Sequence, residues 1–117
     1  MDFKKQKPIY LQIADRLMDS IVGGEYVVDD RMPSVRDVAM EMGVNPNTVM
    51  RSFDYLQGEE IIYNRRGVGY FVGANAREKI IAEQRREFLE EELPAIRNRM
   101  AILGIDPRML LDNEVKD

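Results

Sequence analysis

The chain of 117 residues contains neither cysteine nor histidine. Without cysteine it forms no disulfide and offers no thiolate, which fits a reducing cytosol. Without histidine it lacks the commonest metal ligand and the commonest general base at neutral pH. The usual Ser-His and Cys-His catalytic pairs are therefore excluded. We expect a protein that is not an enzyme and that uses no metal and no cofactor.

Long apolar runs are missing as well. No stretch of about 18 apolar residues occurs, so the sequence predicts no membrane span. Residues 1–8 lack the apolar segment of a signal peptide. We therefore expect a cytoplasmic protein with no membrane partner. A chain of this length forms one small domain with, at most, an appendage.

Positive charge is scarce, and the formal net charge at pH 7 is −4. Residues 1–73 carry nine lysines and arginines against eleven aspartates and glutamates. Bulk charge thus gives no support to nonspecific nucleic-acid binding. If the protein binds DNA, its basic side chains must gather on one face, and the candidates are Lys4, Lys5, Lys7, Arg36, Arg51, Arg65 and Arg66.

The most informative segment is residues 32–51, MPSVRDVAMEMGVNPNTVMR. Ser34 is suited to cap a helix over 35–42, and Gly43 can end it in a left-handed conformation at little steric cost. Asn45 and Pro46 are suited to start a second helix at once, running to about residue 57. The layout predicts a helix-turn-helix, whose second helix can enter a DNA major groove.

The flanking segments complete a small domain. A stripe of apolar residues at helical spacing predicts a first helix over 8–22, followed by a loop over 25–32. The stripe consists of Tyr10, Ala14, Leu17, Met18 and Ile21, with Ile13 beside it. Two short runs at 61–63 and 70–72, rich in β-branched and aromatic residues, are joined by a glycine-containing loop. They predict a β-hairpin, or wing. We expect a mainly α fold with this small hairpin, a winged helix-turn-helix domain over residues 1–73.

Residues 74–117 change character and become charged and helical. Apolar side chains advance along them by four, three, four and three residues, which is a heptad-like seam. Pro94 should kink or restart this helix, and a short last helix should follow Pro107 with Met109, Leu110 and Leu111. We expect a dimerisation arm that pairs about a two-fold axis, and the alternative is a tail that packs only on its own winged domain. The seam residues are Leu89, Leu93, Ile96, Met100 and Leu103.

These motifs together resemble the GntR family of bacterial transcription regulators, and within it the YtrA-like subfamily. The resemblance rests on residues 8–13 (PIYLQI), 32–36 (MPSVR), 43–49 (GVNPNTV) and 65–72 (RRGVGYFV). The short tail indicates the subfamily, since other branches append a much larger domain. The resemblance implies a winged helix-turn-helix, a dimer made by the helical tail, and repression from an operator near the protein's own gene, often beside genes for an ABC transporter.

One position departs from that resemblance. Many members of the family carry a DNA-contacting arginine where this sequence has Met50. A methionine cannot make a charged or bidentate contact, so the operator rules of the wider family do not carry over at this position.

A helical wheel of residues 46–57 places Val49, Phe53 and Leu56 on one side, and Asn47 and Arg51 on the other. Arginine can bond guanine, and asparagine can bond adenine, through the major-groove edges. The plainer alternatives are a solvated helix face, an Arg36–Asp37 ion pair, and wing arginines that only keep an edge soluble. The candidate DNA-binding residues are Ser34, Arg36, Asn45, Asn47, Thr48, Arg51, Arg65, Arg66 and Gly67.

The sequence therefore predicts a homodimeric transcription regulator, a repressor that binds an inverted repeat in double-stranded DNA. The alternative is a winged-helix module for protein interaction, which would need apolar anchors on the outward helix face, where only Met50 qualifies. A small-molecule effector stays open and unidentified. Since the tail is too small to enclose one, we expect any effector site between the winged domain and the tail or at the dimer interface.

Overall fold

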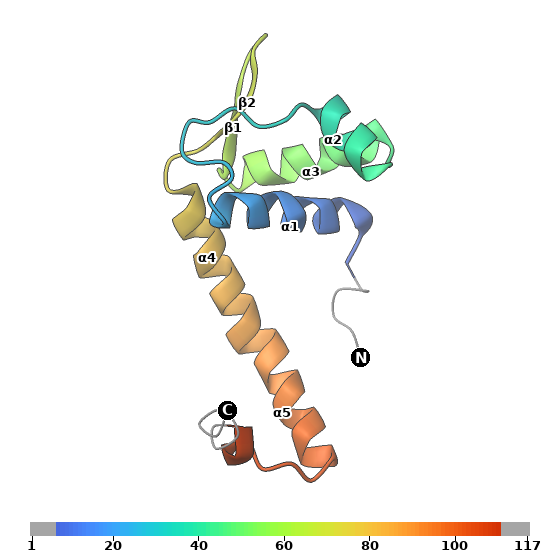
Figure 1. The fold of residues 1–117 in the computed structure, drawn as a ribbon, viewed down its shortest axis with the longest axis vertical. Coiled ribbons are helices and arrows are strands. Elements are labelled where there is room, and N and C mark those ends of the chain that lie inside the picture. The colour runs from blue at the N-terminus through green and yellow to red at the C-terminus, as the bar shows by residue number, and fades with distance from the viewer. Residues whose placement is uncertain (1–6, 111–117) are drawn as a thin grey trace. The chain divides into compact units, whose positions relative to one another are not determined.

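The computed structural model describes residues 7–110 and divides the chain into two compact units, one ending at Ala82 and the other beginning at Glu83. The first unit contains three complete helices, a hairpin and the start of a fourth helix (Figure 1). Its helices are α1 (Ile9–Val22), α2 (Val35–Met42) and α3 (Pro46–Gly58). These bounds confirm the three helices predicted from apolar spacing and capping residues.

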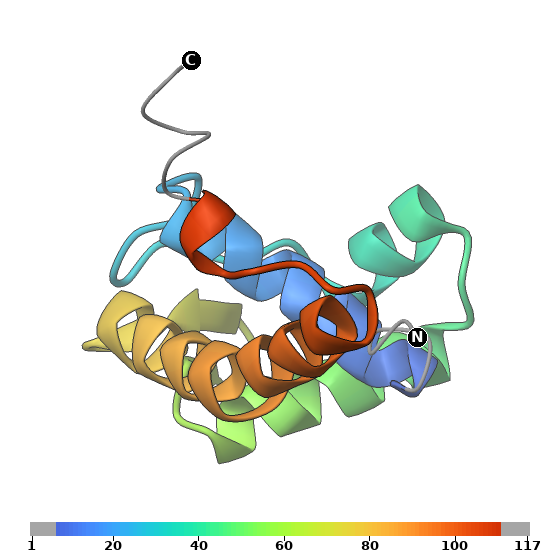
Figure 2. The same cartoon turned by 90° about the horizontal axis from the view of Figure 1, so that it is seen from below.

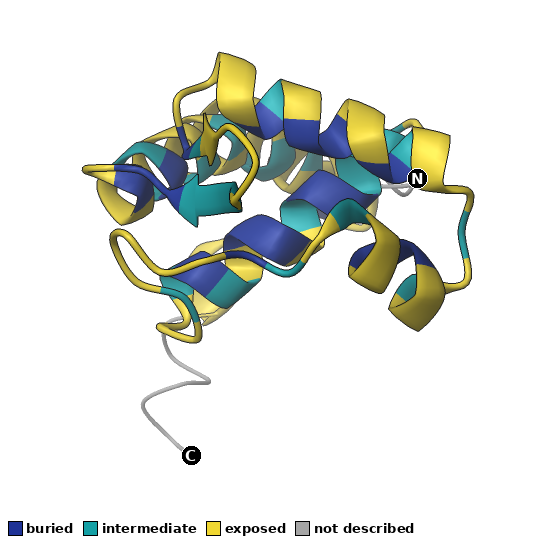
Figure 3. Ribbon diagram, turned by 90° about the horizontal axis from the view of Figure 1, so that it is seen from above, coloured by how far each residue is buried: buried dark blue, intermediate teal, exposed yellow. Residues whose placement is uncertain are grey.

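The core of the first unit forms where α3 packs against α1, α2 and the hairpin. From α3 it takes Val49, Phe53 and Leu56, each fully buried. From α1 it takes the predicted stripe, Ile13, Ala14, Leu17, Met18 and Ile21, while Tyr10 is only half-buried. Figure 3 shows the buried colour on the inner sides of the helices and the exposed colour on their outer sides. Each helix therefore places one apolar side in a shared core.

The turn between α2 and α3 forms through the residues that the sequence singles out. Ser34 Oγ accepts a hydrogen bond from the Asp37 N–H at 3.0 Å, which caps α2. Gly43 has φ 67°, a left-handed conformation in which a Cβ would be strained. Asn45 Oδ1 then accepts from the Asn47 N–H at 2.7 Å and caps α3. The helix-turn-helix geometry thus follows from local side-chain and backbone chemistry.

The wing consists of β1 (Ile62–Arg65) and β2 (Gly69–Val72), paired antiparallel from Ile62↔Val72 to Arg65↔Gly69. The loop before α2 runs along the other side of β2. There the Met32 N–H donates to the Tyr70 carbonyl at 2.8 Å. The Asp29 N–H donates to the Val72 carbonyl at 2.9 Å. The segment predicted as a plain loop therefore runs antiparallel beside β2, joined to it by these hydrogen bonds and by an isolated bridge between Arg31 and Phe71, and it covers one edge of the two-stranded hairpin.

Helix α4 (Ala76–Glu87) begins inside the first unit. Ala76 and Ile80 are fully buried in the core around α3. The compact unit consequently extends to Ala82, beyond residue 73 where the sequence pattern placed the end of the winged domain. The first turns of the tail thus help to close the core.

The second unit contains a π-helical turn, η2 (Phe88–Glu92), followed by α5 (Leu93–Ile102). Pro94 has no N–H, and its ring would clash with the carbonyl four residues before it in an α-helix. The chain widens instead, and the Leu93 N–H donates to the Phe88 carbonyl five residues back. The disruption predicted at Pro94 is therefore a π turn, after which the α-helix restarts at Leu93.

The chain reverses after α5, as Figure 2 shows. Gly104 has φ 71°, and the Ile105 N–H donates to the Met100 carbonyl at 2.8 Å. Asp106 Oδ1 then accepts from the Arg108 N–H at 2.9 Å, which starts the predicted last helical turn. Leu111, expected on that helix, lies outside the described residues.

The predicted seam is largely uncovered in the single chain. Met100 is buried and Leu93 half-buried, whereas Leu89, Ile96 and Leu103 are 50%, 42% and 56% exposed. Among residues 7–110, no helix is long and apolar enough to cross a membrane.

Phe53 is the side chain on which the first unit should depend most. It is fully buried, and its ring meets the Tyr70 ring edge-on with centroids 4.9 Å apart. Phe53→Ala should lower the free energy of unfolding by about 3–5 kcal/mol, because a large cavity opens where α3 meets the wing. Urea denaturation would measure the loss, with the exposed Gln57→Ala on the same helix as control. Equal stability of the two variants would contradict this packing.

Candidate nucleic-acid interface

The outward side of α3 carries the residues proposed to read bases. Asn47 and Arg51 are exposed, while Val49 on the opposite side is fully buried. This distribution agrees with the helical wheel. Thr48 is half-buried, and Asn45 uses Oδ1 for its cap while its amide nitrogen points to no protein partner among the described residues. The first half of α3 thus presents donors and acceptors to solvent.

Arg51 has a partner that the sequence pattern did not reveal. Its guanidinium carbon lies 4.2 Å from the centroid of the Tyr10 ring, a cation–π contact between α3 and α1. The wheel of α1 assigned Tyr10 to the core stripe, and the two residues are too far apart in sequence for a local pattern to pair them. Tyr10 therefore holds the guanidinium at the surface in a restricted position.

The same region of α1 is fixed to α3 by a buried hydroxyl. Ser52 has no exposed surface, and its Oγ donates to the Tyr10 carbonyl at 2.7 Å. Oγ also lies 3.2 Å from the Thr48 carbonyl. The Tyr10 carbonyl thus binds the buried Ser52, while the Tyr10 ring contacts the exposed Arg51 next to it in sequence.

The start of α2 presents a cation without a local counter-ion. Arg36 is exposed, and within residues 7–110 it forms no ion pair, so the alternative pairing with Asp37 does not form there. A cation in the first turn opposes the helix dipole, which modestly disfavours it. A phosphate group at this position would offset that cost.

The tip of the wing is a tight turn. The Val68 N–H donates to the Arg65 carbonyl at 2.8 Å, and Gly67 has φ 77°. Both arginines are exposed at this turn, and the Arg65 guanidinium lies over the Phe71 ring at 5.5 Å. The ring contact therefore restricts Arg65, and no such ring contact is seen for Arg66 among residues 7–110.

A third arginine lies at the wing, at a position that the sequence pattern had assigned to a loop. Arg31 forms a bridge with Phe71 on β2, and a Cβ placed on Gly69 would lie 3.0 Å from Arg31 Nε. Gly69 therefore leaves room for the Arg31 side chain across the strand. Only the pairing of this segment with β2 brings Arg31 to this place.

Helix α3 and the wing border each other through Tyr70. Its hydroxyl lies 3.9 Å from Met50 Sδ, and its ring packs on Phe53. Of the remaining basic candidates, Lys7 pairs with Asp15 at 2.8 Å, and Lys4 and Lys5 lie outside the described residues. The exposed half of α3 and the wing thus form neighbouring parts of one unit.

The family model that matches this chain is that of the bacterial regulatory proteins of the gntR family, over residues 9–72. The chain belongs to the GntR family. The match covers α1 through β2, which are the elements that carry the interface. The family consists of transcription regulators, and the chain is accordingly a regulator with a helix-turn-helix DNA-binding domain rather than an enzyme.

Individual relatives extend the similarity into the tail. The chain is 36% identical to the HTH-type transcriptional regulator YhcF of Bacillus subtilis, covering 94% of this chain and 89% of YhcF. It is 32% identical to the HTH-type transcriptional repressor YtrA of the same organism, over 80% of this chain and 71% of YtrA. The chain is 42% identical to a GntR-family regulator from Bacteroides thetaiotaomicron whose crystal structure is known. The two structures match with a TM-score of 0.76, over 93% of this chain and 95% of the other. These similarities confirm the YtrA-like assignment.

The turn at Gly67 should be sensitive to any side chain. Gly67→Ala should lower the free energy of unfolding by roughly 1 kcal/mol, because φ is positive there and a Cβ is strained even in open space. Gly58→Ala is the matched control, since Gly58 also faces open space but has no positive φ. Thermal melts of both variants would measure the difference. A Gly67→Ala protein as stable as Gly58→Ala would contradict the turn geometry.

Proposed function

We propose that this GntR-family regulator is a homodimeric repressor that binds an inverted-repeat operator, with α3 of each protomer in the major groove. The observation that supports it best is the uncovered outward side of α3, which carries Asn47 and Arg51 beside a wing that presents Arg66. The half-sites should lie about one helical turn, roughly 10 bp, apart. Because DNA is the partner, we place the protein in the cytoplasm.

Base reading and backbone binding fall to different residues in this proposal. Asn45, Asn47, Thr48 and Arg51 read base edges, because they line the start and outward side of α3. Arg36, Arg65 and Arg66, with Ser34 and Gly67 beside them, contact phosphates and set the register. Asp54, one turn beyond Arg51 and exposed, would be repelled by phosphate, so the N-terminal half of α3 is the reading end.

Few phosphate contacts are available to a chain of net charge −4. The negative net charge opposes these contacts only weakly, because carboxylates farther than about 8–10 Å from a phosphate are largely screened at physiological salt. The cation at Arg36 has no carboxylate partner among residues 7–110, and Arg66 projects from the wing tip. Binding should therefore be specific and sensitive to salt rather than strong on any DNA.

Arg51→Ala should weaken operator binding by about 1–3 kcal/mol and relax the preference at one base position, because a bidentate contact to guanine is lost. Fluorescence anisotropy against operator and scrambled DNA would measure both effects, with an operator obtained by random-site selection. Arg97→Ala, an exposed arginine of α5, is the control. Loss of affinity that is equal on both DNAs would contradict a base-reading role.

Arg36→Ala and Arg66→Ala should weaken binding evenly across sequences and lower the salt slope by about one unit each, since each removes one phosphate contact. The same anisotropy titrations at several salt concentrations would measure the slopes. Unchanged slopes in both variants would remove Arg36 and Arg66 from the interface. A selection that enriches no motif would favour the alternative function, a protein-interaction module.

Dimerisation is supported by the apolar residues of the second unit that stay exposed. The seam residues Leu89, Ile96 and Leu103 are uncovered in the single chain, and Met109 and Leu110 are each 52% exposed. An apolar surface of this kind marks an interface in soluble proteins. A second copy supplies the matching seam, because a two-fold axis pairs identical surfaces. One helix-turn-helix rarely binds an operator tightly alone, so dimerisation would control DNA binding.

Leu93→Glu combined with Ile96→Glu should give a folded monomer with little operator affinity, because two charges enter the seam. Sedimentation would measure the mass, and circular dichroism would verify the fold. The control is Asn98→Glu with Ala101→Glu, which adds the same charge at exposed positions outside the seam. A double seam variant that stays dimeric, or a parent that is monomeric at micromolar concentration, contradicts the arm.

The proposed mode of regulation is repression, and its support is the similarity to YtrA, which is named a transcriptional repressor. A dimer bound across a promoter would block polymerase without any further contact. Transcription from a selected operator, with and without the protein, distinguishes repression from activation.

A further inference from the structure

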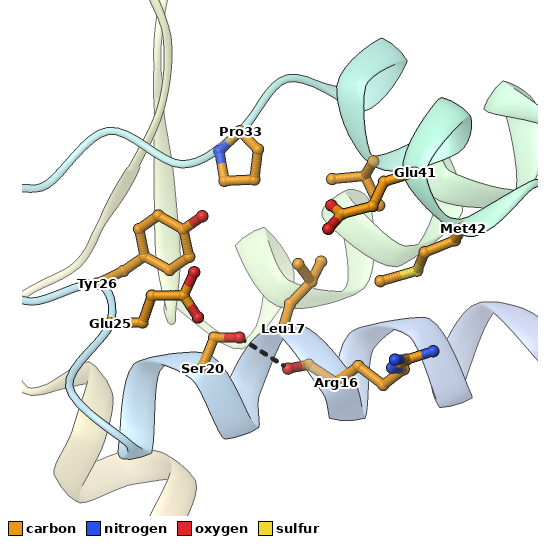
Figure 4. A pocket seen from close by; sticks show the side chains of 9 residues that line it. Arg16, Leu17, Ser20, Glu25, Tyr26, Pro33, Glu41 and Met42 are labelled. Atoms are coloured by element: carbon orange, nitrogen blue, oxygen red, sulfur yellow. Dashed lines mark hydrogen bonds between the residues drawn. The ribbon is translucent and has the colours of Figure 1, made fainter.

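The first unit contains a cavity of about 340 Å³ that no DNA contact uses. It lies between α1, α2 and the segment that follows α1, and Figure 4 shows it from close by. Its apolar lining includes Leu17 of α1 and Val38 of α2, both buried. A space of this size accommodates a small organic molecule.

Two carboxylates, those of Glu25 and Glu41, belong to the polar lining of the cavity. In Figure 4 the carboxylates of Glu25 and Glu41 and the hydroxyl of Tyr26 turn toward the same space. Burial raises the pKa of Tyr26, and the nearby carboxylates of Glu25 and Glu41 raise it further. Both carboxylates are thus close enough to act on one hydroxyl group.

This negative charge is not balanced by the protein. Within residues 7–110, neither Glu25 nor Glu41 forms an ion pair with a lysine or an arginine. Arg16 lines the cavity as well, but Figure 4 places its guanidinium beside Met42, away from Glu25. Near Tyr26 the cavity therefore presents the two carboxylates and the Tyr26 hydroxyl, while the Ser20 hydroxyl donates to the Arg16 carbonyl at 3.3 Å.

We propose that this cavity binds a small organic cation, with a primary ammonium group held between Glu25, Glu41 and Tyr26 and a short apolar chain against Leu17 and Val38. An ammonium group has three N–H donors for these three oxygen acceptors. The Tyr26 ring adds an attractive face for a cation. An anion would be repelled by the two carboxylates, and a neutral alcohol would gain no charge-assisted hydrogen bond.

The site differs in place from the one expected from sequence. The sequence predicted an effector site between the winged domain and the tail or at the dimer interface, whereas this cavity is formed by the first unit alone. Its occupant would contact both α1 and α2, the two helices that pack against α3. Binding at this cavity can be measured on the free protein, independently of DNA binding.

The experiment titrates ¹⁵N-labelled protein with n-butylammonium and, separately, with 1-butanol, which has the same chain without the charge. We expect saturable shifts of the amides of Leu17, Tyr26 and Val38 with n-butylammonium, and at least tenfold weaker binding of 1-butanol. Glu25→Gln and Glu41→Gln should each weaken n-butylammonium binding by about tenfold, or roughly 1.4 kcal/mol. Glu59→Gln, an exposed glutamate outside the cavity, should bind as the parent does.

The proposal would be overturned by equal binding of the amine and the alcohol, by unchanged binding in both cavity variants, or by the absence of saturable shifts at these amides. Both glutamates are exposed, so the variants should stay folded, and their amide spectra verify this before titration. A shift spread evenly over all acidic surfaces would indicate nonspecific charge pairing and would also overturn it.

Discussion

The buried side of α3 is the constraint on which the rest of this structure depends. Val49, Phe53 and Leu56 are fully buried, and burial of each such side chain contributes roughly 1.5–3 kcal/mol. Once that side is turned inward, Asn47 and Arg51 must face solvent. The rotation of α3 about its own axis is thus set by hydrophobic packing. The same packing decides which side chains of α3 are exposed.

Polar contacts then refine what packing alone leaves loose. The buried Ser52 hydroxyl satisfies the Tyr10 carbonyl, and the Tyr10 ring lies against the Arg51 guanidinium. A buried unpaired carbonyl would cost about 1–3 kcal/mol, so the hydrogen bond resists sliding of α1 along α3. The wing is held in turn by Tyr70, which touches both Phe53 and Met50. Tyrosines therefore connect the three parts of the interface.

Much of this arrangement could be predicted from the sequence because its causes are local. Ser34, Gly43 and Asn45 act on residues within a few positions, and their capping and turn geometry appears where their residue types require it. The hairpin was predicted by two apolar runs and a glycine-containing turn. The pairing of residues 29–32 with β2 was missed, because its hydrogen bonds join segments about forty residues apart and the segment has no apolar alternation.

The sequence by itself determined the helix-turn-helix, the wing, the interruption of the tail helix near Pro94, and the side of α3 that faces outward. Each rests on periodicity, capping or the missing N–H of proline, which act over one or two turns. Only the tertiary structure decided the Arg51–Tyr10 contact, the place of Arg31 beside Gly69, the burial of Ala76 and Ile80, and the acidic cavity between α1 and α2. These depend on which surfaces meet when separate elements pack, and no spacing along the chain encodes such distances.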